Sequence, residues 1–331
     1  MRAIQLNETS NHIADLTAKA RRYAYASMAE GTRNAYRNDF RRFTEWCEAH
    51  GRASLPASVE TIALFLTDRV RSCRPRYLCR TIIAIGHVHR AAGLPFDRSR
   101  LDGIVAGVQR AYGTPSKQAA GITVDELRAL VVALPHTLAG ARDRALLTLG
   151  FAAALTPGQL AGLDIGHPSS RSVALVEIAE NGLRFTLRAP QVVDPDLVRA
   201  VPRGGSPCPI EALERWLSLA QINDGPIFRR VRAGGTSQHR IHVCSVRHII
   251  KRAVRAQAIQ SGIDRQAAFE AADRYNGHSL RIGFITSAIR AGATSESIAR
   301  HVGWKSTYMV GQYRRRSGAF HKHPVERVLG S

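Results

Sequence analysis

The first hundred residues repeat apolar side chains with the period of an α-helix. In residues 32–51, TRNAYRNDFRRFTEWCEAHG, these side chains recur at three- and four-residue spacing, at Tyr36, Phe40, Phe43 and Cys47. Thr32 is a candidate N-cap and Gly51 a candidate stop signal. The pattern therefore predicts an amphipathic helix over this stretch.

A second helix of the same design is predicted at residues 76–93, RYLCRTIIAIGHVHRAAG, which ends at Gly93. Its apolar side is formed by Leu78, Ile82 and Ile85. Both helices carry arginine on their other side, and the candidate DNA-binding residues are Arg33, Arg37, Arg41, Arg74, Arg76 and Arg80. Arginine rows of this kind can hold phosphates without reading base sequence, and a solvated helix face is the alternative for each residue.

Helical periodicity stops at residues 113–122, GTPSKQAAGI, where Gly, Pro and Ser collect. We predict a linker there, between a helical domain of residues 1–112 and a second domain of residues 123–331. Thr123 and Glu126 have the spacing of a capping box that opens the next helix. That helix runs to about residue 134 and is followed by an apolar helix in RDRALLTLGFAAAL.

Alternation of apolar and polar positions then replaces the helical period. Residues 172–190, SVALVEIAENGLRFTLRAP, predict two strands joined at Asn181-Gly182, a strong hairpin signal. VRAVPR, residues 198–203, can supply a third strand, and helical patterns resume from Ile210. The predicted fold is mainly α, in the α+β class, with one small three-stranded antiparallel sheet in the second domain.

The charge of the chain points to a polyanionic partner. The 331 residues include 47 basic and 26 acidic side chains, a formal charge of +21 that an enzyme of small metabolites has no physical reason to carry. Residues 1–112 hold 18 basic and 10 acidic side chains, net +8, which leaves net +13 for the remainder. Because the excess is not confined to a tail, both domains are expected to face the same polyanion, although arginine-rich coding bias is an alternative source of it.

Cysteine usage and hydropathy give no sign of secretion or membrane insertion. The five cysteines form no CxxC pair, so neither a disulfide framework nor a metal site is indicated, at Cys47, Cys73, Cys79, Cys208 and Cys244. No stretch approaches eighteen consecutive apolar residues. We expect a cytoplasmic, nucleoid-associated protein with no membrane partner.

The most informative stretch lies near the C-terminus, where HSLR begins at His278, VGW ends at Trp304 and QY ends at Tyr313. Arg281 and Trp304 are 23 positions apart, and Trp304 and Tyr313 are nine apart. With these motifs in register, most of the chain resembles the tyrosine recombinase (phage integrase) family in its Cre-like arrangement. The resemblance implies a helical, SAM-like core-binding domain and a catalytic domain that close around duplex DNA as a C-shaped clamp.

The resemblance also implies roles for these residues. Tyr313 is the expected nucleophile, which attacks a phosphodiester to form a 3′-phosphotyrosyl bond. Arg281 is expected to fork onto the nonbridging oxygens, while His278 and Trp304 donate hydrogen bonds beside it. Tyr308 is the nearby competitor for the nucleophile, and HxxR alone can be a helix-face pair without catalytic meaning. No metal or nucleotide cofactor is expected.

Two elements of the family pattern are missing. AALTPGQLAGL places Thr156 where a first catalytic arginine is expected and Gln159 where an acidic residue is expected. The lysine expected between the second and third strands is replaced by Gln191, and no lysine occurs between Lys117 and Lys251. Arg188 and Arg199 lie nearby, but arginine is a poor proton donor. A lost transition-state donor costs roughly a hundred- to a thousandfold in rate, and a lost arginine clamp on the phosphoryl group roughly a thousandfold or more.

Two hypotheses of different classes therefore stand. The first is a site-specific recombinase or integrase of a mobile element, acting on double-stranded DNA as a homo-oligomer. The second is a catalytically degenerate member that binds DNA as an accessory or regulator, or that is active only with a partner recombinase. Residues 322–331 contain a short apolar segment, which we expect to mediate assembly on DNA, a frayed terminus being the alternative.

Overall fold

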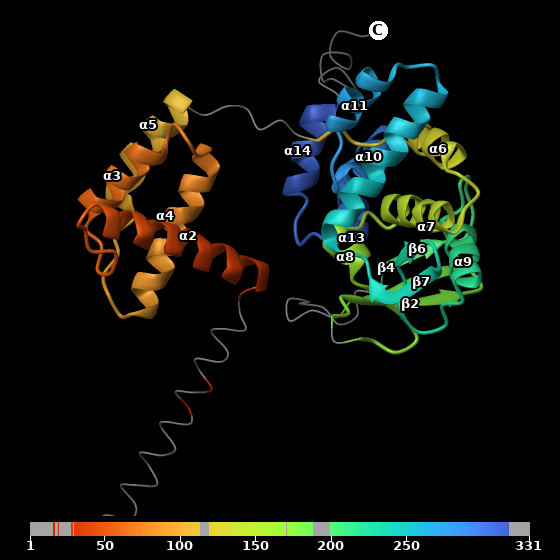
Figure 1. Cartoon of the computed structure of the whole chain (residues 1–331), viewed down its shortest axis with the longest axis horizontal. Helices are drawn as coiled ribbons and strands as arrows, with labels where there is room; N and C mark the ends of the chain where they lie inside the picture. Colours follow the sequence, from red (N-terminus) through yellow and green to blue (C-terminus); the bar gives the residue numbers. More distant parts are fainter. Residues whose placement is uncertain are drawn as a thin grey trace, which may run out of the picture. The chain divides into compact units, whose positions relative to one another are not determined.

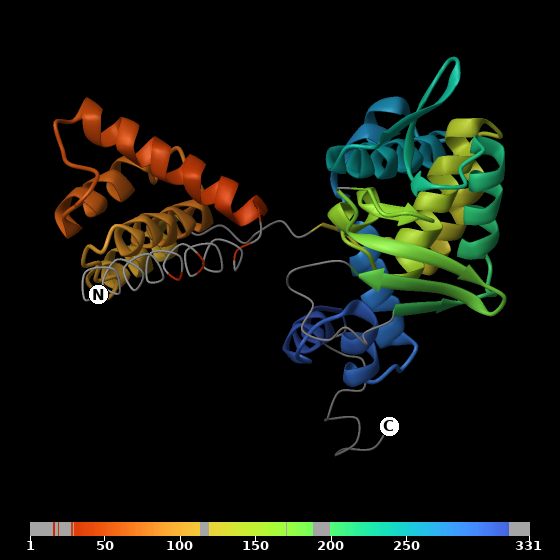
Figure 2. The same ribbon diagram turned by 90° about the horizontal axis from the view of Figure 1, so that it is seen from below.

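We describe a computed structural model of the chain (Figures 1 and 2). It describes residues 16, 19, 28, 30–112, 119–169, 171–187 and 199–317. The chain divides into two compact units, residues 1–117 and 118–331, so that the division falls inside the stretch expected to be a linker. Each unit is described by itself.

The first unit consists of helices around one apolar core. Its elements are α2 (Glu30–Ala49), α3 (Val59–Arg69), α4 (Pro75–Ala91), the short 3-10 helix η1 (Ser99–Leu101) and α5 (Asp102–Tyr112). The core includes Phe43, Cys47, Ile62, Phe65, Leu66, Leu78, Ile82, Ile85 and Leu101. The apolar faces predicted for the two arginine-bearing helices, α2 and α4, are thus the faces that pack together.

The ends of these helices test the predicted start and stop signals. Gly51 and Gly93 follow α2 and α4 with φ of +61° and +70°, the left-handed conformation in which glycine ends helices. The predicted N-cap at Thr32 is wrong, because α2 begins at Glu30 and Thr32 lies within its first turn. The prediction placed the start at the first strong capping residue, whereas the helix extends two residues further toward the N-terminus.

The second unit holds a five-stranded sheet in the order β4-β3-β2-β1-β5. Its strands are β1 (Leu163–Ile165), β2 (Ala174–Ala179), β3 (Gly182–Leu187), β4 (Arg199–Pro202) and β5 (Gly225–Pro226). β2, β3 and β4 are antiparallel and are the three strands predicted, whereas β1 pairs parallel to β2 and β5 pairs antiparallel to β1. A separate hairpin joins β6 (Arg229–Arg232) to β7 (Gly235–Arg240).

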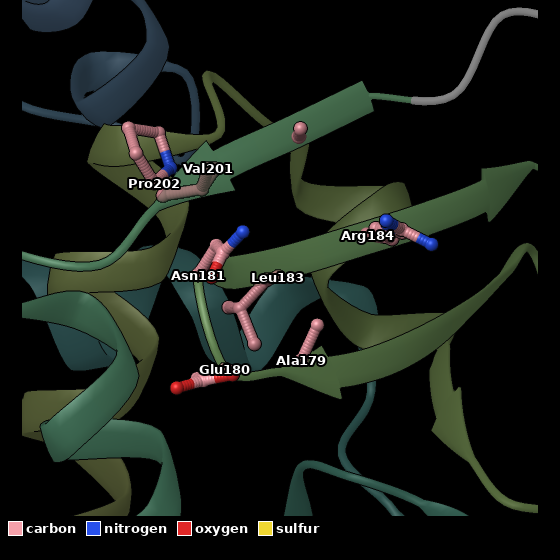
Figure 3. Close-up of a pocket in the computed structure, with 9 residues that line it drawn as sticks. Ala179, Glu180, Asn181, Leu183, Arg184, Val201 and Pro202 are labelled. Carbon is pink, nitrogen blue, oxygen red and sulfur yellow. The ribbon is translucent and has the colours of Figure 1, made fainter.

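The β2–β3 turn is shifted by one residue from the predicted position. Ala179 pairs with Gly182, so Glu180 and Asn181 form the turn and Gly182 is the first residue of β3. A Cβ at Gly182 would lie 2.2 Å from the carbonyl oxygen of Val201 on β4, which explains the glycine. Figure 3 shows this end of the sheet, where a cavity of about 420 Å³ is lined by the end of β2, by the β2–β3 turn and by residues of β3 and β4.

The helices of the second unit surround two apolar cores. They are α6 (Val124–Ala133), α7 (Leu138–Ala152), α8 (Pro157–Ala161), α9 (Pro209–Ala220), α10 (Val243–Gln260), α11 (Arg265–Asp273), α12 (Ser279–Arg290), α13 (Ser295–Val302) and α14 (Tyr308–Ser317). The larger core joins α6, α7, α9 and α10 to the sheet. The smaller one consists of Ala154, Ile285, Ile289, Ile298, Ala299, Val302 and Val310. It fixes α12, α13 and α14 to one another.

The predicted fold class is confirmed, because the chain is mainly helical with a small sheet in its second unit. The capping box at the start of α6 is also confirmed: the Thr123 amide donates to Glu126 at 2.7 Å, and the Glu126 amide donates to the Thr123 hydroxyl at 3.2 Å. β1, β5 and the β6–β7 hairpin were not predicted. None of the described helices is both long enough and apolar enough to cross a membrane.

Candidate active site

The HSLR motif forms the start of α12. His278 is the N-cap of this helix, and its backbone amide donates to the side-chain oxygen of Asn276 at 2.8 Å. The next two residues, Ser279 and Leu280, are fully buried and anchor the first turn. Arg281 follows within that turn, so the helix presents the histidine and the arginine of the motif at one end.

A glycine later in α12 lets this end pack tightly against the chain that enters the second unit. A Cβ at Gly283 would lie 1.7 Å from the carbonyl oxygen of Ile122, a distance that no side chain tolerates. The Ile122 amide in turn donates to the carbonyl of Ser279 at 3.0 Å. The direction of α12, and with it the position of Arg281, is therefore fixed by backbone contacts.

Arg281 lies between a backbone carbonyl and an aromatic ring. Its Nη1 donates to the carbonyl of Ala154 at 2.7 Å, and its guanidinium carbon lies 5.2 Å from the centre of the Trp304 ring. Burial, followed by the positive charge of Arg199, lowers the pKa of Arg281 to about 10. The guanidinium still remains charged at neutral pH.

The histidine of the motif has a lower pKa than a free histidine, so its neutral form persists to lower pH. Partial burial, followed by the positive charge of Arg281, lowers the pKa of His278. A neutral imidazole can donate a hydrogen bond from one ring nitrogen and accept a proton at the other.

Trp304 and Tyr313 stack on one another beside Arg281. Gly303 follows α13 as its C-cap. Its φ of +74° turns the chain so that the Trp304 amide donates to the carbonyl of Ala299 at 2.8 Å. The Tyr313 ring, from α14, lies 5.9 Å from the indole with an interplanar angle of 18°. Both rings pack against the smaller apolar core. The structure thus brings together the four residues that the sequence motifs singled out, His278, Arg281, Trp304 and Tyr313.

Tyr308, the competing tyrosine, lies apart from this group. It is the first residue of α14 and is 67% exposed. Five residues along a helix correspond to about 140° of rotation, so Tyr308 and Tyr313 lie on different sides of α14. The side chain of Tyr308 makes no hydrogen bond or ring contact with any of the described residues.

Thr156 and Gln159 lie beside the site, and both are engaged in capping α8. The Gln159 amide donates to the Thr156 hydroxyl at 3.3 Å, and the Thr156 amide donates to the Gln159 side chain at 2.9 Å. Pro157 packs closely on Gly277, since a Cβ added to Gly277 would lie 2.5 Å from the proline ring. This turn therefore adjoins His278, although its side chains cap a helix and add no charge.

Two further residues reach the site that sequence reasoning did not place there. Arg199 on β4 is 7% exposed and donates from Nη2 to the carbonyl of Val302 at 2.6 Å. His301 stacks on Phe284, with ring centres 4.6 Å apart, and its Nε2 lies 2.8 Å from the carbonyl oxygen of Ala152. The sequence did contain a signal for Arg199. It lies two positions before Val201 in a predicted strand, so both side chains point to the same, buried face of that strand.

Burial lowers the pKa of both of these groups. For Arg199 burial is the only cause. For His301 burial outweighs the hydrogen bond to Ala152, and the charges of Arg199 and Arg281 lower the pKa further. The charge of Arg199 thus contributes to the lowered pKa of both Arg281 and His301.

Gln191 and residues 322–331 lie outside the described residues. Of the first unit's arginines, Arg41 is paired with Glu45 at 2.6 Å, Arg80 binds buried Asp39 at 2.6 Å, and Arg37 donates to Asn34 at 3.3 Å. Arg33 donates to the carbonyl of Met28. Arg74 and Arg76 are exposed, and their side chains make no hydrogen bond or ion pair within the part of the chain described.

Comparisons with known proteins identify the family. The model of the phage integrase family matches residues 121–319. An integrase/recombinase XerD homolog of Selenomonas ruminantium is 29% identical over 321 residues, which cover 95% of this chain and 89% of that relative. The chain therefore belongs to the phage integrase family, the tyrosine recombinases.

Solved structures of low sequence identity share the fold. The Tn1549 transposon integrase in complex with circular intermediate DNA has a TM-score of 0.61 at 13% identity, covering 94% of this chain and 96% of that one. A λ integrase (75–356) dimer bound to a COC′ core site has a TM-score of 0.57 at 16% identity, covering 93% and 96%. These structures show the shared fold, while the family match favours site-specific recombination over the catalytically degenerate alternative.

Proposed function

We propose that this chain cuts and rejoins duplex DNA at a specific site through a 3′-phosphotyrosyl intermediate on Tyr313. The observation that carries the proposal is the placement of Tyr313 against Trp304 and beside Arg281. These three residues come from α14, the turn after α13, and α12, and the smaller apolar core holds all three elements together.

The chemistry follows from the groups present. The phenolic oxygen of Tyr313 attacks phosphorus, its proton passes to the neutral imidazole of His278, and the bond from phosphorus to the 5′ oxygen breaks. Arg281 neutralises the charge that develops on the nonbridging oxygens, and the indole N–H of Trp304 donates a hydrogen bond to one of these oxygens. Water supplies the proton of the departing 5′ oxygen in this scheme, since Gln191 replaces the expected lysine. Attack by a 5′ hydroxyl on the phosphotyrosine reverses these steps.

Binding of DNA is proposed for both units. In the first unit Arg74 and Arg76 are the favoured phosphate contacts, because Arg41 and Arg80 are already paired with carboxylates. We further propose that the chain works as an oligomer on DNA, with a partner recombinase as the alternative source of a second subunit. Support comes from the λ integrase relative, which is a dimer on its core site.

The test is covalent capture on DNA. A randomised duplex library is first selected for binding, and the recovered site is then built with a nick beside the scissile phosphate, so that the cleaved fragment diffuses away. We expect a denaturation-resistant protein–DNA adduct with the full chain and with Tyr308→Phe, the matched control. Loss of the adduct in Tyr313→Phe supports the assignment. An adduct that persists in Tyr313→Phe and is lost in Tyr308→Phe contradicts it.

A further inference from the structure

Two guanidinium groups, those of Arg199 and Arg281, lie at the candidate site, and no carboxylate of the described residues pairs with either one. Neither forms an ion pair in the part of the chain described, and each makes one hydrogen bond there, to the carbonyls of Val302 and Ala154 respectively. The charge of Arg199 disfavours the charged form of Arg281. Burying one such charge is costly, and burying two together is costlier, unless an anion joins them.

Arg199 has buried hydrogen-bond donors without acceptors in the described structure. Its Nε and Nη1 are fully shielded from solvent in the described structure and have no hydrogen-bond partner. Nη2 alone is bound, to the Val302 carbonyl at 2.6 Å. Two unpaired donor nitrogens on one planar guanidinium can donate to the oxygens of a tetrahedral anion.

Other buried or partly buried arginines in the chain have partners for their guanidinium nitrogens. Arg142 pairs with Asp143 at 2.7 Å, and Arg240 pairs with Asp164 at 2.6 Å. Arg229, 6% exposed, donates from all three nitrogens to Pro226, Gln238 and Asp224. Arg199 differs from these three because most of its donors are left without acceptors.

The backbone opposite Arg199 is shaped to admit its guanidinium. A Cβ at residue 303 would lie 1.9 Å from Nη2 of Arg199, and Gly303 also has the left-handed φ of +74°. The same turn carries Trp304. The guanidinium is therefore seated directly beside the turn that presents the indole to Arg281 and Tyr313.

We propose that Arg199 is a second phosphate-binding arginine, which together with Arg281 contacts the nonbridging oxygens of the scissile phosphate and replaces the arginine that Thr156 cannot supply. Its identity as a phosphate ligand rests on the proposed function, whereas the anion site itself does not. The charge comes from strand β4, while the turn before α8, where the family pattern has its arginine, keeps only a capping role.

The first experiment tests the anion site without DNA. Tungstate, a tetrahedral oxyanion, is titrated calorimetrically into the full chain at low salt, and crystals soaked in tungstate are examined for anomalous scattering. We expect one tungsten peak within hydrogen-bond reach of both guanidiniums, and binding weakened roughly tenfold to a hundredfold in Arg199→Met and in Arg281→Met. Arg184→Met, an exposed arginine on neighbouring β3, is the control and keeps wild-type binding (Figure 3).

Two additional variants separate loss of charge from loss of fold. Arg199→Lys retains a cation and is expected to recover part of the tungstate affinity. Gly303→Ala keeps the arginine but places a methyl group at its Nη2, so binding should weaken while Arg199 is still present. A tungsten peak remote from Arg199, or unchanged affinity in Arg199→Met, overturns the proposal.

The second experiment tests the contact during cleavage. The suicide duplex is made with its ordinary phosphodiester and with an uncharged methylphosphonate at the scissile position. Arg199→Met should slow adduct formation roughly a thousandfold on the phosphodiester, and less than about tenfold on the methylphosphonate, which has lost the charge that the arginine meets. Equal slowing on both substrates indicates a structural brace and overturns the proposal. If the wild type forms no adduct with any DNA, the proposed function fails, and the tungstate result still decides on Arg199.

Discussion

The indole of Trp304 and the phenol ring of Tyr313 lie 5.9 Å apart and nearly parallel, at 18°. The indole contacts Arg281 as well, whose guanidinium carbon is 5.2 Å from the centre of its ring. In the mechanism proposed above, Trp304 therefore has two separable roles, as a platform that orients Tyr313 and as an N–H donor to the phosphate.

Substitutions at Trp304 should separate these functions. Trp304→Phe keeps an aromatic platform and loses the donor, so adduct formation on the suicide duplex should slow roughly a hundredfold. Trp304→Ala removes both and should be slower still. Trp46→Phe, in the first unit, removes an indole hydrogen bond to Asp68 and is the control expected to cleave at the wild-type rate. Equal rates for Trp304→Phe and wild type would show that the indole N–H plays no part.

Acid should destabilise the folded chain through its site histidines. The folded-state pKa of His301 lies below the ordinary value of about 6.5, because of burial and the charges of Arg199 and Arg281. The unfolded chain then binds more protons than the folded chain just below that value. The stabilisation is fully present above about pH 6.5 and is lost as pH falls through the folded pKa. His278 has a pKa shifted in the same direction and adds to the loss.

Thermal unfolding of wild type and His301→Gln, between pH 7.5 and 5.5, measures this contribution. Glutamine can still donate to the Ala152 carbonyl but does not titrate, so its unfolding temperature should depend less on pH than that of the wild type. Identical pH profiles would mean that His301 protonates as easily in the folded chain as in the unfolded one.

Salt dependence of DNA binding should report which arginines contact phosphate. For a protein with six or more phosphate contacts, affinity falls roughly a thousandfold or more between 50 and 200 mM salt. Arg74→Gln and Arg76→Gln should each reduce the slope of log K against log salt by about 1. Arg41→Gln should reduce it less, because that side chain is already paired with Glu45. Equal reductions in all three variants would contradict the preference for unpaired arginines.

Much of the fold could be predicted because it depends on local periodicity. The apolar faces of α2 and α4, the glycine stops and the three antiparallel strands each follow from spacing within one segment. β1 and β5 have three and two residues, too few to show any alternation. β1 exists only because β2 provides a neighbour, and β5 only because β1 does. The β2–β3 turn shifted by one residue since Gly182 is needed for the close approach of β4, a constraint that no local pattern contains.

The site shows the same division between local and long-range information. His278 and Arg281 lie in one turn of helix, and the spacing to Trp304 and Tyr313 is that of the family, so all four could be proposed from sequence. Arg199 reaches the Val302 carbonyl across 103 positions of sequence. Its participation depends on how β4 packs against the turn after α13, and only the three-dimensional arrangement shows it.

Thr156 occupies the position where the family pattern expects an arginine, and an arginine can be placed there by substitution. Thr156→Arg removes the hydroxyl that caps α8 and should lower the free energy of unfolding by about 1 kcal/mol. In a chain whose Arg199 already serves the phosphate, the new guanidinium has no vacant role, so adduct formation should change little. In Arg199→Met the role is vacant, and Thr156→Arg should restore part of the lost rate, because the Thr156 turn adjoins both His278 and Arg281.

The control for this pair is Thr156→Ala in both backgrounds, which removes the same cap and adds no charge. It should cost similar stability and restore nothing. Rates of adduct formation are measured on the suicide duplex at a temperature where every variant is folded. A large gain from Thr156→Arg in the wild-type background would show that the second guanidinium position is empty, and therefore that Arg199 does not fill it. Rescue confined to the Arg199→Met background would show that the two arginines, which come from different elements of the fold, serve the same phosphate.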